Sequence, residues 1–178
     1  MGKSILLQAL CCALAEENLG TMVMTAWTRV AAGLFRAPTL CSLLGIDFAR
    51  LGHEPQHTEQ QLGQIREKFA TYFGNRKRLA VFVIDEISFV VPAALHWLDK
   101  TLRGILNEPD VPLGGVLVIL AGDFWQKPPP SGSSLAEILV STDAPVRTVR
   151  EHVSYSPTST TAKGLDIFRH AGRSTLTR

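Results

Sequence analysis

Three short strings of residues have the types and the order needed for phosphate chemistry. Gly2-Lys3-Ser4 matches the end of a phosphate-binding loop, where backbone amides hold phosphates, a lysine reaches the β- and γ-phosphates and a hydroxyl binds Mg²⁺. The acidic pair Asp85-Glu86 directly follows an apolar run, and Gln126 follows a second one. Together the three strings predict a site that binds ATP and Mg²⁺ and hydrolyses the nucleotide.

Helix and strand signals alternate along the chain, which predicts an α/β domain with a parallel sheet. Because the carboxyl ends of parallel strands share one edge of a sheet, Asp85 and Gln126 are expected to emerge together. We expect strands at 21–26, 79–84 and 115–121, and helices from Ser4 to about 18–20 and at 30–34, 59–72 and 92–106.

Composition sets broad limits on what this chain is. Its 178 residues suffice for one domain with a substantial core, and no apolar run approaches the length of a membrane span. The net charge of +2 neither demands nor excludes nucleic acid as a partner. Cys11, Cys12 and Cys41 form neither spaced metal pairs nor a disulfide framework, which favours a reducing compartment.

Several stretches of the chain resemble motifs of the PIF family (petite integration frequency) of DNA helicases, in the RecD-like branch of superfamily one. Residues 1–4 resemble the end of the family's G-T-G-K-S/T loop. Residues 25–32 resemble T-A-x-T-G-x-A-A, and 39–46 resemble T-x-H-S-x-x-G-I. Residues 84–90 resemble I-D-E-I/V-S-M-V/L, and 113–129 resemble G-G-x-x-V/I-I/L-x-G-D-x-x-Q-L-P-P. The resemblance implies a RecA-like, phosphate-loop NTPase fold.

The resemblance also implies a role for each residue of the nucleotide site. Lys3 would neutralise charge on the β- and γ-phosphates next to Gly2, while Ser4 and Asp85 would hold Mg²⁺. Glu86 would orient and deprotonate the attacking water. Gln126 resembles the family's γ-phosphate sensor. The residues expected to bind the nucleotide and its metal are therefore Gly2, Lys3, Ser4, Asp85 and Gln126.

Thr25 and Thr28 resemble the part of the family that touches the backbone of single-stranded DNA, where hydroxyls and amides bind phosphates without reading sequence. The alternative is that both threonines end a strand and cap the next helix. For Gln126 the alternative is an amide that caps a turn, and for Asp85-Glu86 it is a solvated strand end. These alternatives stay open at the level of sequence.

Three residues depart from the family's motifs. Arg29 stands where the family has Gly, Cys41 where it usually has His, and Lys127 where it usually has Leu. The first change either alters a backbone turn or adds a charge near the strand. The third removes an apolar anchor beside the sensor.

The chain begins at Met1, so the first half of the phosphate loop and the strand before it are expected to be missing, as in a fragment or a truncated gene model. We expect a motor domain over 1–140, and a Ser/Thr-rich connector leading to the next helicase motif over 141–178. The resemblance places that motif's arginine just past the end and leaves out a second motor domain. The chain by itself is therefore expected to hydrolyse ATP slowly or not at all.

One zinc-protease pattern, H-E-x-x-H, occurs at His53-Glu54-Pro55-Gln56-His57. That chemistry needs both histidines on one face of a continuous helix. Pro55 disfavours helical geometry at Glu54, so we expect a loop without metal.

The sequence thus predicts an ATP-dependent DNA helicase that translocates on single-stranded DNA and unwinds duplex DNA as a monomer. Family resemblance implies roles in DNA repair, recombination and telomere maintenance, and a place in the nucleus or mitochondrion although no targeting signal is visible. The alternative is a catalytically inactive remnant that only binds single-stranded DNA. Neither reading involves a membrane.

Overall fold

The computed structural model describes residues 3–17, 20–46, 48–73, 79–123, 135, 163–164 and 166–167. The strands are β1 (Thr21–Ala26), β2 (Leu79–Asp85) and β3 (Leu117–Leu120). The helices are α1 (Lys3–Glu16), α2 (Arg29–Leu34), α3 (Leu40–Leu44), α4 (Glu59–Phe73) and α5 (Pro92–Leu106), with 3₁₀ turns η1 (Phe48–Arg50), η2 (Ile87–Phe89) and η3 (Pro112–Gly115).

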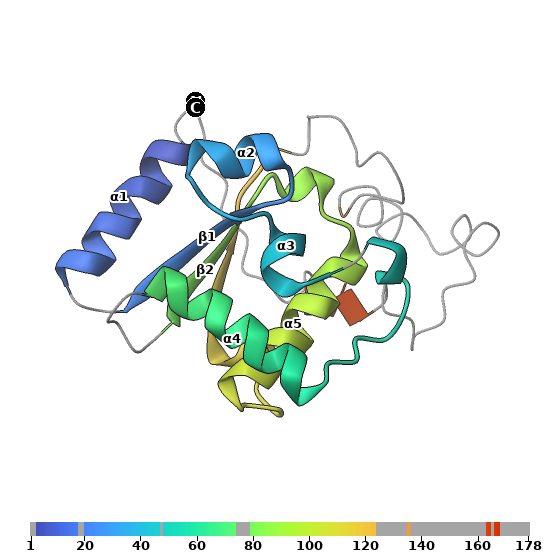
Figure 1. The fold of residues 1–178 in the computed structure, drawn as a ribbon. Helices are drawn as coiled ribbons and strands as arrows, with labels where there is room; N and C mark the ends of the chain where they lie inside the picture. Colours follow the sequence, from blue (N-terminus) through green and yellow to red (C-terminus); the bar gives the residue numbers. More distant parts are fainter. Residues whose placement is uncertain are drawn as a thin grey trace.

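The three strands form one parallel sheet in the order β1-β2-β3 (Figure 1). Ala26 at the end of β1 lies opposite Asp85, and Ile84 lies opposite Leu120. The carboxyl ends of all three strands therefore lie at one edge, as the sequence predicts for an α/β domain.

Alternating side chains of the central strand face two separate cores. Val81 and Val83 pack with Leu7 of α1 on one face. Phe82 and Ile84 belong to the larger cluster on the other face, which α3, α4 and α5 complete (Figure 1). Both faces of a parallel sheet must be covered, which explains why β2 is apolar from Leu79 to Ile84. The result is a sheet between two helical layers.

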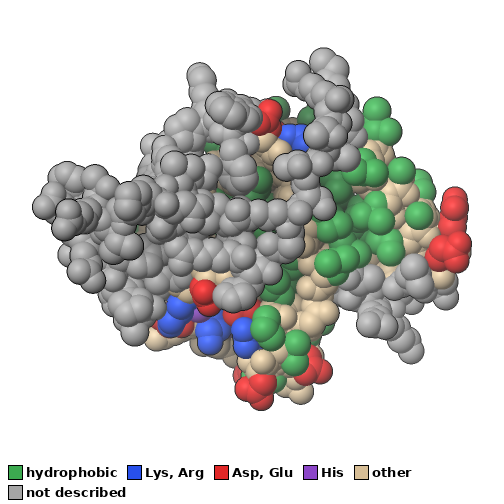
Figure 2. All heavy atoms as spheres, turned by 180° about the vertical axis from the view of Figure 1, so that it is seen from behind, with side chains coloured by type: hydrophobic (Ala, Val, Ile, Leu, Met, Phe, Trp, Pro, Cys, Tyr) green, Lys and Arg blue, Asp and Glu red, His purple; other side chains and the backbone are tan. Residues whose placement is uncertain are grey.

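Helix α1 is apolar on nearly every side, yet it buries only one face. Leu7 lies against the sheet, whereas Ile5 and Leu6 are exposed. Seen from behind, hydrophobic side chains gather on the side of the molecule where α1 lies (Figure 2). None of the helices in the described part of the chain is long and apolar enough to cross a membrane.

Two elements differ from the sequence prediction. Strand β3 begins at Leu117 rather than at Gly115, because Leu113, Gly114 and Gly115 have positive φ angles of 53°, 61° and 75° and form a turn. Helix α3 has only five residues, too few to show a helical period in the sequence. The expected boundary between 1–140 and 141–178 lies outside the described residues.

Candidate functional site

The carboxyl edge of the sheet is held together by backbone hydrogen bonds between the segments that leave β2 and β3. The amide of Ala121 donates to Ile84 O at 2.8 Å, and the amide of Ile87 donates to Ala121 O at 2.9 Å. These bonds keep Asp85, the last residue of β2, and Glu86, which follows it, next to Gly122 and Asp123. The edge thus brings three carboxylates into one neighbourhood.

Asp85 is the buried carboxylate of this edge. Its side chain is 6 % exposed, and its Oδ1 accepts a hydrogen bond from the amide of Glu86 at 2.9 Å. No basic side chain of the described residues forms an ion pair with it. A buried carboxylate without an internal cation is costly unless a ligand brings one, so Asp85 suits a metal-holding role.

Glu86 is half-buried and has the left-handed backbone angles φ 60° and ψ 44°. A non-glycine residue in this region carries strain, which often marks a functional position. Burial raises the pKa of Glu86, the charges of Asp85 and Asp123 raise it further, and Lys3 lowers it. A carboxylate with a raised pKa is a stronger base, as the activation of water requires.

Gly122 explains how the two segments approach so closely. A Cβ atom at this position would lie 2.7 Å from both Cγ2 and the backbone nitrogen of Ile87. Any larger residue would push the turn that carries Glu86 away from β3. The sequence motifs predict a role for Gln126 in this segment but none for Gly122 or Asp123. The signal that could have found them is their place directly after the strand next to β2.

Lys3, the first residue of α1, is close enough for its charge to act on Glu86. The structure therefore brings Lys3, Asp85 and Glu86 together, as the sequence predicts, and adds Asp123. Gly2, Gln126 and the side chain of Ser4 lie outside the described part of the structure, so their places stay predictions.

The two threonines expected at DNA have local partners instead. Thr25 is fully buried, and its hydroxyl donates to Val83 O at 2.8 Å, so this side chain cannot reach a DNA strand in this conformation. The hydroxyl oxygen of Thr28 caps α2 by accepting from the amide of Ala31 at 3.2 Å. The capping alternative thus describes the Thr28 hydroxyl, whereas the Thr25 hydroxyl bonds to the neighbouring strand β2. A Thr28 hydroxyl that accepts in the cap still has its proton to donate.

A family model described as PIF1-like helicase matches residues 1–143. The chain belongs to the PIF1-like helicase family. Among curated proteins it is similar to the ATP-dependent DNA helicase PIF1 of Trypanosoma brucei brucei, with 32 % identity over 129 residues that cover 70 % of this chain and 11 % of that protein. The chain thus spans a small part of this relative.

Solved structures of PIF1-like helicases share the fold. Pif1 from Candida albicans superposes with a TM-score of 0.55 at 29 % identity, over 73 % of this chain and 28 % of that one. Pif1 from a Bacteroides species, in complex with ADP-AlF4, superposes with a TM-score of 0.53 at 30 % identity, over 79 % and 30 %. The RecA-like fold expected from the sequence is confirmed.

Two of the departures from the motifs of PIF1-like helicases can be placed in the structure. Cys41 is buried in the core cluster that α3 helps to build, and burial raises the pKa of its thiol to about 11. It is therefore a core residue with an unreactive thiol. Arg29 is exposed at the start of α2. Lys127 lies outside the described residues.

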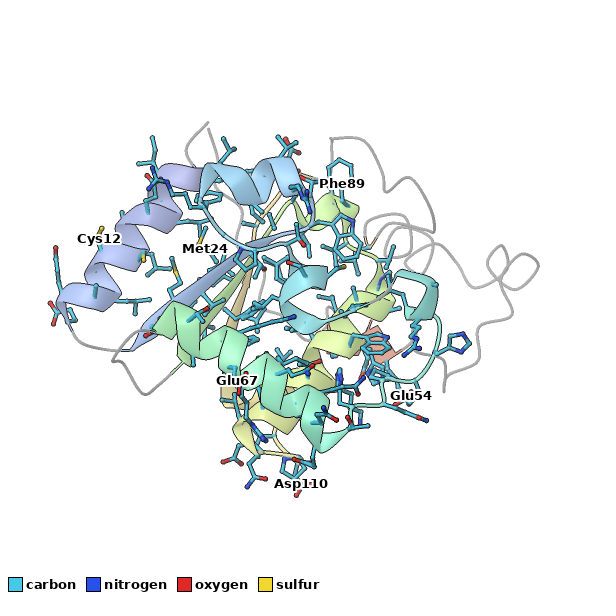
Figure 3. The ribbon with its side chains drawn as sticks, in the orientation of Figure 1. Cys12, Met24, Glu54, Glu67, Phe89 and Asp110 are labelled. Atoms are coloured by element: carbon cyan, nitrogen blue, oxygen red, sulfur yellow. The ribbon has the colours of Figure 1, made fainter. Side chains whose placement is uncertain are left out.

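The H-E-x-x-H stretch is a loop, as predicted, and its polar groups serve packing. Nε2 of His57 lies 2.9 Å from the hydroxyl of Thr101, and the His57 ring contacts Trp97 edge-on. Glu54 accepts from His96 at 3.0 Å (Figure 3 labels Glu54). No metal-binding group of three or more side chains occurs within the described ranges.

Proposed function

We propose that this chain is the first motor domain of an ATP-dependent DNA helicase, in which ATP hydrolysis drives translocation on single-stranded DNA and unwinding of duplex DNA. The observation that carries the proposal is the meeting of Lys3, Asp85 and Glu86 at one sheet edge. The name of the Trypanosoma relative and the nucleotide analogue on the Bacteroides Pif1 support it.

Each described residue of the edge suits one part of hydrolysis. Lys3 would offset charge on the β- and γ-phosphates, and the half-buried Glu86 would accept a proton from the attacking water. Gly2 and Ser4 would complete the phosphate contacts next to Lys3, and Gln126 would sense the γ-phosphate. Because burial, with smaller contributions from Asp85 and Asp123, raises the pKa of Glu86, this carboxylate suits the role of a base.

The donor set at the edge also fits Mg²⁺. Asp85 offers a buried carboxylate that lacks an internal counter-ion among the described residues, and magnesium prefers such oxygen ligands. Asp85 and the Ser4 hydroxyl would hold the ion. When bound, Mg²⁺ would neutralise negative charge on the phosphates.

The nucleic-acid partner of the proposed motor is single-stranded DNA, with duplex DNA ahead of it. The turn after β1 contributes Thr28, whose hydroxyl retains a proton for a phosphate oxygen. For the whole protein we propose a monomeric motor with a role in DNA repair, recombination or telomere maintenance, in the nucleus or the mitochondrion.

The test is ATP hydrolysis under single-turnover conditions, with the chain in excess over labelled ATP so that even slow reaction is detected. Single-stranded DNA should accelerate hydrolysis, and Lys3→Ala should reduce it by about 100-fold or more, the effect of losing one preorganised electrostatic group. Lys100→Ala, which removes an exposed charge on α5, should change nothing.

Hydrolysis that is absent with and without DNA, alongside retained DNA binding, would favour the inactive remnant. Hydrolysis that Lys3→Ala leaves unchanged would contradict the assigned site.

A further inference from the structure

Helix α2 rests on the end of β1 through one small apolar face. Ala31 and Ala32 form a cluster with Ala26, which is fully buried. The other side of α2 carries Arg29, and Val30 and Leu34 beside it are 81 % and 74 % exposed. Helix α2 lies at the sheet edge where the proposed nucleotide site lies (Figure 1), and its exposed side is basic and apolar.

The backbone shows what the replacement of glycine by Arg29 does. Arg29 is the first residue of α2, and it is absent from the non-glycine residues with positive φ, which include Arg36 and Glu86. A helical conformation suits arginine as well as glycine. The departure from the family motif therefore leaves the turn unchanged and adds a positive charge to it.

That charge has no partner in the described part of the chain, unlike the charges of Arg66 and Arg103. Arg66 donates to the carbonyls of Gly104 and Ile105, and Arg103 pairs with Asp99. These guanidinium groups hold the fold together. For Arg29 no hydrogen bond or ion pair with a described residue is found, and its side chain is exposed. Its donors are available to a ligand.

We propose that Arg29 binds a backbone phosphate of single-stranded DNA next to the Thr28 hydroxyl, a contact that the glycine of the family motif cannot make. A guanidinium group matches the geometry of a phosphate and can donate two parallel hydrogen bonds. This inference rests on the proposed function, since it requires DNA at the turn after β1. Compared with a chain that has glycine at position 29, this chain should bind single-stranded DNA more tightly and with a stronger dependence on salt, and the added contact should not depend on base sequence.

The experiment measures the affinity of the 178-residue chain for a fluorescent oligothymidine by anisotropy, over a series of salt concentrations. One lost phosphate contact lowers the slope of log affinity against log salt by about 0.7 for single strands. Arg29→Ala and Arg29→Gly should both show this loss, with about three- to fivefold weaker binding at low salt, the range of exposed ion pairs. Arg29→Lys should keep the slope, because it keeps the charge.

Lys100→Ala serves as the control for removing an exposed charge elsewhere, and circular dichroism checks that each variant is folded. A slope that Arg29→Ala leaves unchanged, or that Lys100→Ala lowers equally, overturns the inference while the proposed function stands. A wild-type chain that does not bind the oligonucleotide contradicts the proposed function itself, and the inference with it.

Discussion

Two buried aspartates of this domain have opposite surroundings. Asp99, in the middle of α5, is 4 % exposed, and its Oδ1 accepts from Nε of Arg103 at 2.8 Å and from the amide of Leu113 at 2.6 Å. Asp85 is 6 % exposed, accepts one amide hydrogen bond, and is followed directly by a second carboxylate, Glu86. Asp99 forms an ion pair with Arg103, whereas no basic side chain of the described residues forms one with Asp85.

The difference separates a carboxylate that stabilises the fold from the one that we propose to hold the metal ion. Asp99 neutralises Arg103 and fixes the turn that leads into β3, so its charge stabilises the fold. Burial raises the pKa of Glu86, and its repulsion with Asp85 raises it further and costs stability until a cation binds. Burial alone would have made the two aspartates look alike.

The largest effect is expected at Glu86. Glu86→Gln should lower single-turnover ATP hydrolysis by about 100- to 10,000-fold, the usual contribution of a general base, and should leave ATP binding unchanged. Glu67→Gln changes an exposed glutamate of α4 in the same way and should have no effect (Figure 3). Hydrolysis at the wild-type rate in Glu86→Gln would remove this residue from the mechanism.

The two aspartates should differ in stability when each is neutralised. Asp99→Asn leaves Arg103 half-buried without its counter-ion and should lower the free energy of unfolding by about 2 kcal/mol. Asp85→Asn removes a repulsion and should leave the stability unchanged or increase it. Urea unfolding of both variants without nucleotide checks the order, and a larger loss in Asp85→Asn would invert the comparison.

Two glycine substitutions should have opposite signs. Gly122→Ala places a methyl group against Ile87 and should destabilise the domain by about 1–3 kcal/mol, as overpacking does. Gly63→Ala, in α4, meets nothing within 4 Å and should stabilise it by about 0.5–1 kcal/mol through helix propensity. Thermal unfolding of the pair is the measurement, and equal shifts would show that the sheet edge is not closely packed.

Acid should destabilise the domain away from the nucleotide edge. Burial lowers the pKa of His96 below its usual 6.5 despite its hydrogen bond to Glu54, so stability from this group is lost as pH falls below 6.5. Burial acts to raise the pKa of Glu54, but hydrogen bonds from Lys163 and His96 outweigh it and lower the pKa below 4.5. Glu54→Gln should therefore remove the part of the loss that occurs below pH 4.5, as unfolding at several pH values would reveal.

Local patterns in the sequence predicted much of the fold. The limits of β1 and α5 are those expected, because apolar runs define buried strands and Pro92 begins α5 at a position that proline favours. The strand expected from Gly115 begins only at Leu117, because the turn before it is held by a hydrogen bond from the amide of Leu113 to Asp99, fourteen residues earlier. No local pattern carries that information.

The candidate site, like the fold, could be predicted from the sequence only where local motifs determine it. The motifs predict roles at a nucleotide site for Lys3, Asp85 and Glu86, whose charges lie near one another in the structure, and these roles stay predictions. They could not show that the hydroxyl of Thr25 donates a hydrogen bond to the carbonyl of Val83, 58 residues away. Nor could they show that Asp123 acts on Glu86, because this depends on the alignment of β2 with β3. Contacts between distant segments decide both points.

The most direct test of the nucleotide edge is the dependence of ATP binding on Mg²⁺ in the wild-type chain and in Asp85→Asn. A fluorescent ATP analogue is titrated with and without Mg²⁺, and Asp110→Asn, at an exposed position, is the control (Figure 3). The account predicts that Mg²⁺ tightens binding to the wild type and to the control about tenfold or more, or at least about 1.4 kcal/mol. It also predicts that Asp85→Asn abolishes this gain while the chain stays folded. Equal binding of the analogue with and without Mg²⁺ would contradict the proposal that Asp85 holds the metal ion of a bound nucleotide. So would an Asp85→Asn variant in which Mg²⁺ tightens binding as much as in the wild type.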